Sequence, residues 1–216
     1  MPKQLTEAEK ASKKKLILDE ARKMCGEMNF GDITMSKLAL RCNIAKGTVF
    51  KYFETKETLF SIILYDEYAK WIESEAEDLK KIKSFTKESY KKFILEETEK
   101  IINEREMLVR LISIKRTILD NNVNVDELVK GMDDLTKGIK MLSVETAGKL
   151  DFLDVMDIFE FYEARHVIVV GGYNLALSIN NRDKLKEMNE QRLIQVDFVR
   201  LVLKTTESQL KALLYC

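Results

Sequence analysis

The chain has 216 residues and a mass of 25.1 kDa, of which 45% are apolar and 33% charged, enough for one large domain or two small ones with a real core. Lysine plus arginine number 36, as do aspartate plus glutamate, so overall charge gives no indication of a polyanionic partner. The longest uncharged run, 166–181, has 16 residues, short of the roughly 20 apolar residues of a transmembrane helix. These features exclude a membrane span.

The charges are unevenly distributed along the chain. Residues 1–54 hold 11 Lys/Arg and 7 Asp/Glu, a net of 11 − 7 = +4, whereas residues 55–216 hold 25 and 29, a net of 25 − 29 = −4. Counterion release from phosphates needs a locally basic surface and not a basic protein. The N-terminal quarter is therefore the candidate nucleic-acid-binding part.

The three cysteines, Cys25, Cys42 and Cys216, have no metal-ligand spacing and are odd in number. They indicate reduced thiols in a reducing compartment, and together with the lack of a signal-peptide pattern they predict a cytoplasmic protein. Cys25 and Cys42 fall on apolar helix stripes, which favours core packing over a redox role. The sequence predicts no metal site and no cofactor.

Helical periodicity runs through the whole chain, and the single proline, Pro2, leaves the rest free of helix breakers. The β-branched run 166–170 is flanked by helical patterns on both sides, so we interpret it as helix as well. The sequence predicts an all-α fold of about nine helices, at 7–28, 34–42, 45–52, 55–80, 85–103, 105–119, 125–149, 151–179 and 184–214.

The first three predicted helices have the form of a helix-turn-helix. Thr34 and Thr55 are good N-caps for the helices that follow them, and the stripe Met35, Leu38, Ala39 and Cys42 has the spacing of a buried face. Asn29 and Asn43 stand where a left-handed residue commonly ends a helix. We therefore expect residues 1–54 to be a DNA-binding domain and 55–80 to connect it to a second domain within 55–216.

A recognition helix reads DNA with the exposed side chains near its N-terminus. In the short helix 45–52 the spacing turns Val49 inward and leaves the other face outward. Lys46 and Thr48 suit base edges or phosphates, and Gly47 permits close backbone approach. The predicted DNA-binding residues are Thr34, Lys46, Gly47, Thr48, Phe50, Lys51, Tyr52, Thr55 and Lys56.

Residues from about Leu16 to Phe60 resemble the DNA-binding domain of TetR/AcrR-type transcriptional repressors. The resemblance lies in ILDEARKMCGEMNF, TMSKLALRCNI, AKGTVFKYF and TKETLF, which match in order and spacing. It implies a homodimer that binds palindromic double-stranded operator DNA and releases it when a small-molecule effector enters the C-terminal domain. Ala45 stands where the family usually has a hydroxyl residue that caps the helix, and Phe50 replaces a common tyrosine.

The C-terminal helices are the candidate dimer interface and effector site. Residues 166–179 are apolar nearly all round, and the last helix carries a broader apolar face than one core needs. An ordinary monomer core is the alternative reading of this pattern. Given the resemblance, we favour an intermolecular four-helix bundle, with interface residues Val170, Gly171, Tyr173, Phe198, Leu201 and Val202.

The sequence gives less direct evidence for an effector site than for the dimer interface. Aromatic residues at helical spacing are more often core than pocket, and a lone histidine in an apolar run is more often a core or interface residue. Arg110, which lies in an apolar segment, would need an anionic partner if it were buried, although a salt bridge or a surface position is the commoner outcome. The candidate ligand-binding residues are Trp71, Phe93, Arg110, Tyr162 and His166, and the expected effector is small and largely apolar.

Two other classes of function are open. An enzyme is disfavoured because His166 is the only histidine and the sequence has no phosphate-binding loop, HExxH or CxxC motif; we expect no catalytic residues. A helical adaptor could use the helix-turn-helix for protein contact, but the basic N-terminal quarter and the Lys46-Gly47-Thr48 sequence favour DNA.

Overall fold

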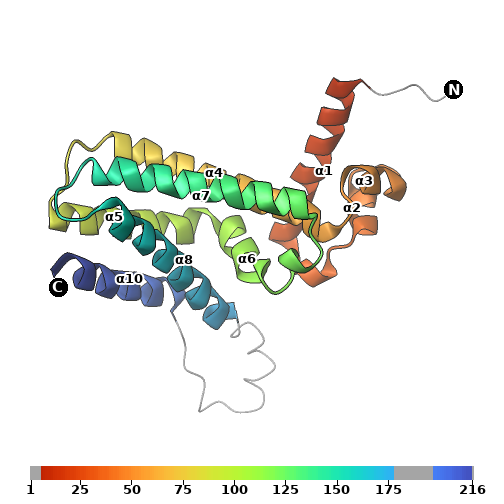
Figure 1. The fold of residues 1–216 in the computed structure, drawn as a ribbon. Helices are drawn as coiled ribbons and strands as arrows, with labels where there is room; N and C mark the ends of the chain where they lie inside the picture. The colour runs from red at the N-terminus through yellow and green to blue at the C-terminus, as the bar shows by residue number, and fades with distance from the viewer. Residues whose placement is uncertain (1–5, 178–196, 216) are drawn as a thin grey trace, which may run out of the picture. The chain divides into compact units, whose positions relative to one another are not determined.

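The structure is a computed structural model that describes residues 6–177 and 197–215. Those residues form nine α-helices and two short 3-10 helices and contain no strand, which confirms the all-α prediction (Figure 1). The elements are α1 (Glu7–Glu27), η1 (Phe30–Asp32), α2 (Met35–Arg41), α3 (Lys46–Tyr52), α4 (Lys56–Lys80), α5 (Lys87–Glu104), α6 (Glu106–Lys115), η2 (Leu119–Asn121), α7 (Val125–Ala147), α8 (Val155–Leu177) and α10 (Phe198–Tyr215).

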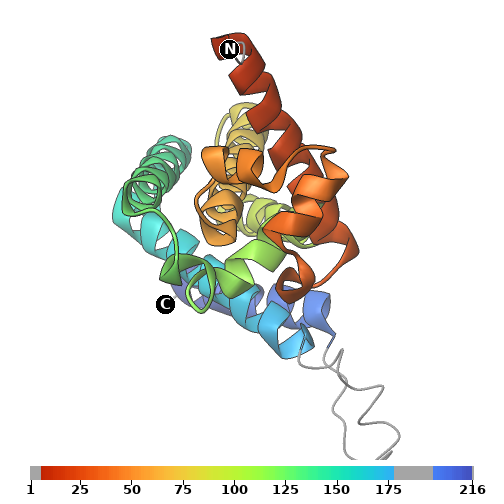
Figure 2. The same cartoon turned by 90° about the vertical axis from the view of Figure 1, so that its right-hand side faces the viewer.

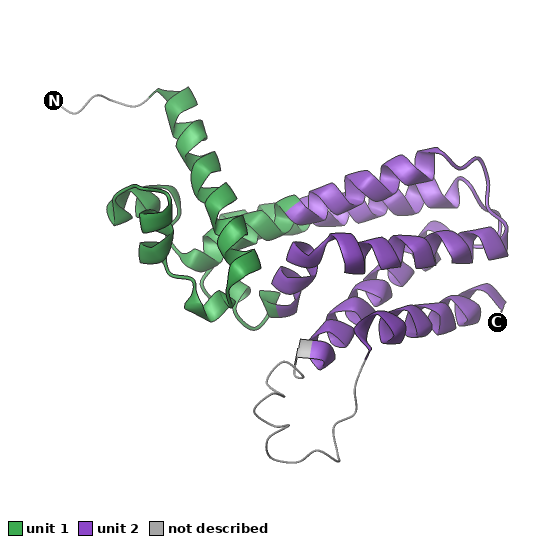
Figure 3. Ribbon diagram, turned by 180° about the vertical axis from the view of Figure 1, so that it is seen from behind, with its two compact units in different colours: residues 1–66, 114–132 green, residues 67–113, 133–216 purple. Residues whose placement is uncertain are grey.

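The chain divides into two compact units (Figure 3). Unit 1 comprises residues 1–66 and 114–132, and unit 2 comprises residues 67–113 and 133–216. The predicted DNA-binding domain, 1–54, lies wholly in unit 1, which also takes in the start of α4 and residues 114–132. Three helices, α4, α6 and α7, contribute residues to both units.

Unit 1 is built on a three-helix core. Figure 2 shows α1, α2 and α3 (red to orange) gathered together, with α2 packed on both α1 and α3. Ile17, Met24, Leu38 and Val49 are fully or almost fully buried in this unit. Their helical spacing in the sequence is what turns them to one side.

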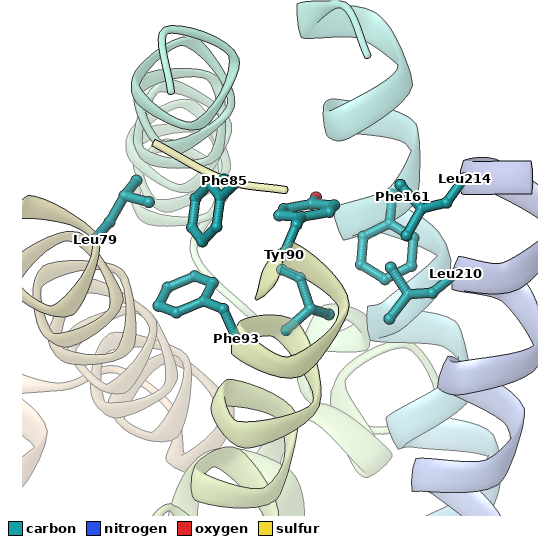
Figure 4. Packing of buried hydrophobic residues seen from close by; sticks show 8 residues of the cluster. Leu79, Phe85, Tyr90, Phe93, Phe161, Leu210 and Leu214 are labelled. Atoms are coloured by element: carbon teal, nitrogen blue, oxygen red, sulfur yellow. The ribbon is translucent and has the colours of Figure 1, made fainter. Parts of the chain in front are cut away.

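The core of unit 2 is an aromatic and leucine-rich cluster contributed by five segments, α4, the turn after it, α5, α8 and α10 (Figure 4). Its buried members are Leu79, Phe85, Tyr90, Phe93, Ile94, Phe161, Leu210 and Leu214. Phe85 meets Tyr90 edge-on, with ring centroids 5.4 Å apart. Phe93, a candidate ligand-binding residue, therefore belongs to this packed core.

Two glycines on α7 let it approach α4 closely. A Cβ at Gly131 would lie 2.2 Å from Cδ2 of Tyr65 in unit 1, and one at Gly138 would lie 2.6 Å from Cδ1 of Ile72 in unit 2. Both distances are far below van der Waals contact, so a side chain at Gly131 would collide with the Tyr65 ring, and one at Gly138 would require the terminal methyl of Ile72 to move. The seven-residue spacing on each helix, 131 to 138 and 65 to 72, places the two contacts on one face of each helix.

The helix boundaries follow the caps. We predicted a helix from residue 151, but α8 begins at Val155, because Asp154 Oδ1 accepts hydrogen bonds from the N–H groups of Met156 (2.7 Å) and Asp157 (2.9 Å). Of the predicted helix 184–214, the described part is Phe198–Tyr215, and 184–196 lies outside the described residues. The last residues of the predicted helix 151–179, 178 and 179, also lie outside them.

The left-handed residue expected at Asn29 is not there. Asn29 has φ −68° and ψ 147°, which is extended backbone, and its carbonyl oxygen accepts the N–H of Asp32 at 2.9 Å. The 3-10 helix Phe30–Asp32 thus makes the connection that a left-handed cap would otherwise have made. The same expectation for Asn43 is confirmed, with φ 52°.

Candidate functional site

The turn between α2 and α3 fixes how α3 is presented. Asn43 takes the left-handed conformation, and the Ile44 N–H donates back to the Ala39 carbonyl at 3.0 Å. Leu38 and Val49 bury the inner faces of the two helices. This is the tight turn that a helix-turn-helix requires, and it holds the opposite face of α3 away from the core.

Six of the predicted DNA-binding residues lie on α3. Lys46, Gly47, Phe50 and Lys51 are exposed, while Thr48 and Tyr52 are half-buried. Lys46 Nζ lies 5.7 Å from the centroid of the Phe50 ring, so the cation sits beside the one large apolar group of this surface. Of the two side chains predicted to contact base edges, Lys46 is therefore exposed and Thr48 is partly accessible.

The starts of α2, α3 and α4 differ in their caps. Thr34 Oγ1 accepts the Lys37 N–H at 3.2 Å, and Thr55 Oγ1 accepts the Thr58 N–H at 3.0 Å, as the sequence predicted. Ala45 begins α3 without a side-chain cap. The N–H groups at the start of α3 thus have no side-chain acceptor there, and such groups favour anions.

Thr55 and Lys56 also have structural partners inside unit 1. The Thr55 hydroxyl donates to the Asn122 carbonyl at 2.7 Å. Lys56 Nζ donates to the carbonyls of Phe30 (2.9 Å) and Ile33 (3.0 Å) and lies 4.1 Å from the Phe30 ring centroid. Burial lowers the pKa of Lys56. Both residues therefore fasten the start of α4, a role that sequence reasoning missed because the carbonyl acceptors carry no side-chain signal.

Unit 2 contains a buried polar network that the sequence analysis also missed. Glu75 on α4 accepts three hydrogen bonds, from Tyr162 OH to Oε1 and from Trp71 Nε1 and Arg165 Nη2 to Oε2, each 2.8 Å long. Glu75 and Arg165 are 0% and 1% exposed. A signal did exist, since Glu75 falls four residues after Trp71 on the apolar stripe of its helix, where a carboxylate needs a buried partner.

Beside this network lies a small cavity of about 20 Å³. That is room for roughly one water molecule, against about 300–1,000 Å³ for a typical ligand pocket. Its lining comes from α4, α5, α6 and α8 and consists of Tyr68, Trp71, Ile101, Leu108, Ile112, Tyr162, Arg165, His166 and Val169. Three candidate ligand-binding residues, Trp71, Tyr162 and His166, are thus brought together.

The other two candidates are not among the residues that line the cavity. Phe93 packs in the core cluster of Figure 4. Arg110 is half-buried on α6, with Nη1 3.7 Å from Glu106 Oε1, the salt bridge that we considered the commoner outcome. The buried arginine of this unit is Arg165, which the sequence analysis did not single out.

The predicted interface residues divide between core and surface. Val202 is fully buried inside the chain, because Gly172 lets α8 approach α10 so closely that a Cβ there would lie 2.5 Å from Val202 Cγ2. Val202 therefore has no surface to offer a partner, which corrects its assignment to the interface. Gly172 makes this close approach within the chain, whereas Gly171 is exposed and has open space around it.

The remaining interface candidates are half-buried. Tyr173 and Phe198 meet edge-on across α8 and α10, with ring centroids 5.6 Å apart, and Val170 and Leu201 keep part of their surface. Val167, one turn before Gly171 on α8, is 68% exposed. An apolar strip along α8 thus remains open.

The thiols and the other site classes can be placed as well. Cys25 and Cys42 are buried and unbridged, as core packing predicts, and Cys216 lies outside the described residues. No group of three or more His, Cys, Asp or Glu side chains within 6–177 and 197–215 could hold a metal ion. Over the same residues, no helix has both the length and the apolar character needed to cross a membrane.

Comparison with known proteins agrees with this geometry. The family model described as "Bacterial regulatory proteins, tetR family" matches residues 17–62, which contain α2, α3 and the start of α4. The fatty acid metabolism regulator protein of Bacillus subtilis (strain 168) is 24% identical over 140 residues, 64% of this chain and 72% of the relative.

Solved structures share the fold. A TetR transcriptional regulator from Rhodococcus sp. RHA1 superposes with a TM-score of 0.59 at 15% identity, covering 96% of this chain and 98% of that one. The fatty acid degradation regulator FadR from Bacillus halodurans gives 0.55 at 16% identity, covering 96% of each chain. The family match and the exposed α3 identify residues 17–62 as the DNA-binding domain of a TetR-type transcriptional regulator, and the solved structures show that the chain shares their fold.

Proposed function

We propose that this regulator is a repressor that binds a palindromic operator as a homodimer in the cytoplasm and is released from it by a small, largely apolar effector. The observation that carries the proposal is the outer face of α3, where Lys46, Gly47 and Phe50 are exposed while Val49 anchors the helix to the core. Side chains placed this way suit base edges, and neighbouring lysines suit phosphates.

Dimerisation is part of the proposal because α3, the helix that would contact the bases, is short. A seven-residue α3 reaches few bases, and two-fold symmetry doubles the contacts. The open strip of α8, with Val167 and Gly171, and the half-buried Leu201 of α10 support a partner helix pair on this side. This arrangement is the intermolecular bundle proposed for the two copies.

For the effector, we propose a fatty acid or an acyl derivative. Two of the similar proteins are named as regulators of fatty acid metabolism and of fatty acid degradation. In this chain Ile101, Leu108 and Ile112 line one cavity together with three aromatic rings and Arg165. A mainly apolar lining with a few convergent polar groups is typical of a ligand site. Because the cavity is only about 20 Å³, the effector must displace part of the wall.

Helix α6 could transmit effector binding to the DNA-binding unit. Leu108 and Ile112 line the cavity in unit 2, and α6 continues into unit 1. In unit 1, two hydrogen bonds join the segment that follows α6 to the start of α4. The Thr55 hydroxyl donates to the Asn122 carbonyl (2.7 Å), and the Asn124 N–H donates to the Thr58 hydroxyl (3.0 Å). We propose that an effector which shifts α6 changes these hydrogen bonds and so the position of the start of α4.

DNA binding tests the proposal. Replacing Lys46 and Lys51 by glutamate should abolish binding of the chain to the DNA upstream of its own gene, measured by fluorescence anisotropy, because two phosphate- or base-directed cations become repulsive. Circular dichroism and mass in solution should not change, since both side chains are exposed.

The matched control is Lys92→Glu with Lys140→Glu, two exposed lysines of unit 2 that change the net charge equally. This control variant should bind DNA nearly as the original chain does at moderate salt. Unchanged affinity in the Lys46/Lys51 variant would instead favour the adaptor, which uses the helix-turn-helix for protein contact.

A further inference from the structure

Helix α1 extends well past the core of unit 1. Its first buried residue is Ile17, so residues 7–16 form roughly three turns of helix that take no part in the core. A capping box fixes the start of these turns: the Glu9 N–H donates to Thr6 Oγ1 at 3.2 Å, and the Thr6 N–H donates to Glu9 Oε2 at 2.7 Å. Figures 1 and 2 both show the turns (red) projecting beyond α2 and α3. The projecting part of α1 is therefore a preformed helix.

Four lysines lie on the projecting part, against two glutamates, which gives residues 7–16 a net charge of 4 − 2 = +2. The lysines are Lys10, Lys13, Lys14 and Lys15. At about 100° per residue, the first three lie within about 60° of Ile17 around the helix axis, whereas Lys15 lies about 160° away. The face of α1 that is apolar in the core thus carries cations beyond it. We call Lys10, Lys13 and Lys14 the basic strip of α1.

The basic strip of α1 lies beside the end of α3, within the same unit. Lys14 Nζ is 5.8 Å from the centroid of the Phe53 ring, and Phe53 directly follows α3. The hydrogen bond to Glu7 raises the pKa of Lys10, and the side chain of Tyr52, the last residue of α3, adds to the rise. Lys10 and Tyr52 are therefore close enough to interact. The strip thus borders the helix that is proposed to contact bases.

The charges of the strip are only partly compensated. Lys10 Nζ lies 2.6 Å from Glu7 Oε1, but both side chains are exposed, and such a surface pair contributes little, so a phosphate would replace it at small cost. Lys13 and Lys14 form no ion pair among the described residues. Lys13 acts only at longer range on Glu9, whose pKa is lowered first by its hydrogen bonds with Thr6. Lys13 is therefore the cation of the strip most available to an outside anion.

Acidic side chains lie near one member of the strip. Lys14 lines a cleft of unit 1 together with Glu54, Asp126 and Glu127, and all three carboxylates are exposed. They would repel a phosphate that approached Lys14. Lys13 does not line this cleft. We therefore expect Lys13 to contribute more than Lys14 to binding of a polyanion.

We propose that the basic strip of α1 binds phosphate groups of duplex DNA next to the bases that α3 contacts. Lysine contacts with phosphates release condensed counterions and carry no sequence information, so they raise affinity for any duplex. The capped helix already holds the three lysines on one face, so binding orders little additional backbone. The inference rests on the proposed DNA-binding function and adds to it a contact made outside the helix-turn-helix.

The salt dependence of DNA binding tests the proposal, because each phosphate contact contributes about 0.9 to the slope of log affinity against log salt concentration. The full-length chain and a variant with Lys10, Lys13 and Lys14 replaced by glutamine would be titrated by fluorescence anisotropy. The probe is a labelled duplex of arbitrary sequence, about 30 base pairs long, in about 0.05 to 0.3 M salt. We expect the slope of the triple variant to be smaller in magnitude by about 2–3.

Single variants separate a contact from a general effect of charge. Lys13→Gln should reduce the slope by about 1, and Lys14→Gln should reduce it less. The matched control is Lys15→Gln, which makes the same charge change on the opposite face of the same helix and should leave the slope unchanged. Arginine at all three strip positions keeps the charge and should keep the slope. Circular dichroism should be the same throughout, since glutamine, arginine and lysine have similar helix propensities.

Two outcomes would overturn the inference. An unchanged slope in the triple glutamine variant would mean that the projecting turns of α1 stay in solvent when DNA is bound. Equal losses in Lys13→Gln and Lys15→Gln would mean that the lysines act only through the net charge of the unit.

The proposed function fails separately. If the triple variant loses slope on the arbitrary duplex, but the unaltered chain does not prefer the DNA upstream of its own gene, the operator role is wrong and the α1 contact stands. If the upstream DNA is bound and the Lys46/Lys51 variant abolishes this binding, while the triple variant keeps the full slope, the α1 contact is wrong and the operator role stands.

Discussion

At the scale of single residues, the chain has exposed side chains on α3 that are proposed to contact DNA and, in unit 2, a buried ion pair. Glu75 and Arg165 are almost completely inaccessible, and their charges are compensated only by each other and by the hydroxyl and indole donors around them. A buried ion pair is weak support for stability as a pair, but loss of one partner strands a charge. The two residues should therefore be strongly coupled.

A double-mutant cycle measures this coupling. Glu75→Met and Arg165→Met should each destabilise the fold by about 3–5 kcal/mol, because the other charge stays buried without its partner. The double variant should lose less than either single variant, since it buries no charge. Urea unfolding of the four proteins gives the cycle, and additive losses would contradict the coupling.

Ala45 is a second residue with a measurable effect. It is the N-cap of α3 and offers no side-chain acceptor. Ala45→Ser should stabilise the protein by about 0.5–2 kcal/mol, because a hydroxyl can accept the N–H of the second or third helical residue. Thermal unfolding measures the gain. Ala45→Val, which adds bulk without an acceptor, serves as the control and should show no such gain.

At the scale of elements, α7 depends on glycine where it lies against α4. The built Cβ positions at Gly131 and Gly138 fall 2.2 Å from the Tyr65 ring and 2.6 Å from Ile72. Glycine normally weakens a helix by about 0.5–1 kcal/mol relative to alanine, so its presence at both contacts indicates that packing outweighs propensity here.

Gly131→Ala and Gly138→Ala should each lower the free energy of unfolding by about 1–3 kcal/mol, as overpacking does. Gly26→Ala in α1 is the matched control, because nothing lies within 4 Å of its built Cβ. This control should be neutral or slightly stabilising. Urea denaturation compares the three, and equal effects at all three positions would show that α7 can shift away from α4 at little cost.

The ion cluster between α4 and α5 gives a pH test with two opposite signs. Hydrogen bonds from Lys100, and then Lys81, hold the pKa of Asp78 below its ordinary value, so Asp78 stabilises the fold above that value and loses this effect as the pH falls below about 4. Burial raises the pKa of Glu97, so its ionisation destabilises the fold as the pH rises above its ordinary value.

Unfolding free energies measured between pH 3 and 7 should separate the two carboxyls. Asp78→Asn should be less stable than the unaltered protein near neutral pH, and the difference should shrink below about pH 4. Glu97→Gln should gain stability relative to the unaltered protein as the pH rises above about 4.5. Parallel pH profiles for all three proteins would contradict the roles assigned to Asp78 and Glu97.

At the scale of the whole molecule, the proposed assembly is a pair of copies joined through α8 and α10. Val167 is 68% exposed on the open strip of α8, whereas Val125, 69% exposed, lies on α7. Val167→Glu should raise the dimer dissociation constant by tenfold or more, roughly 1.4 kcal/mol, because a charge would be buried in the interface. Val125→Glu should have no such effect. Sedimentation equilibrium compares them, and an unaffected dimer in Val167→Glu would place the interface elsewhere.

Much of the fold could be predicted from the sequence because its signals are local. The apolar stripe of α2, the left-handed Asn43 and the caps at Thr34 and Thr55 involve residues within one or two helical turns of one another. The same spacing argument placed Val49 inward and left Lys46 and Phe50 exposed. The prediction of a left-handed Asn29 was wrong because the chain leaves α1 in extended conformation and turns in a 3-10 helix, where the Asp32 N–H donates to the Asn29 carbonyl.

The sequence alone thus determined an all-helical chain with an N-terminal helix-turn-helix and an outward α3, since helical spacing states which face of each helix is apolar. Only the tertiary structure decided which distant segments meet those faces. It brought Arg165 to Glu75, 90 residues away, turned Lys56 onto backbone carbonyls and made Gly172, not Gly171, the close-contact glycine. Periodicity specifies that a face will be buried, but the partner across it depends on packing between elements far apart in the chain.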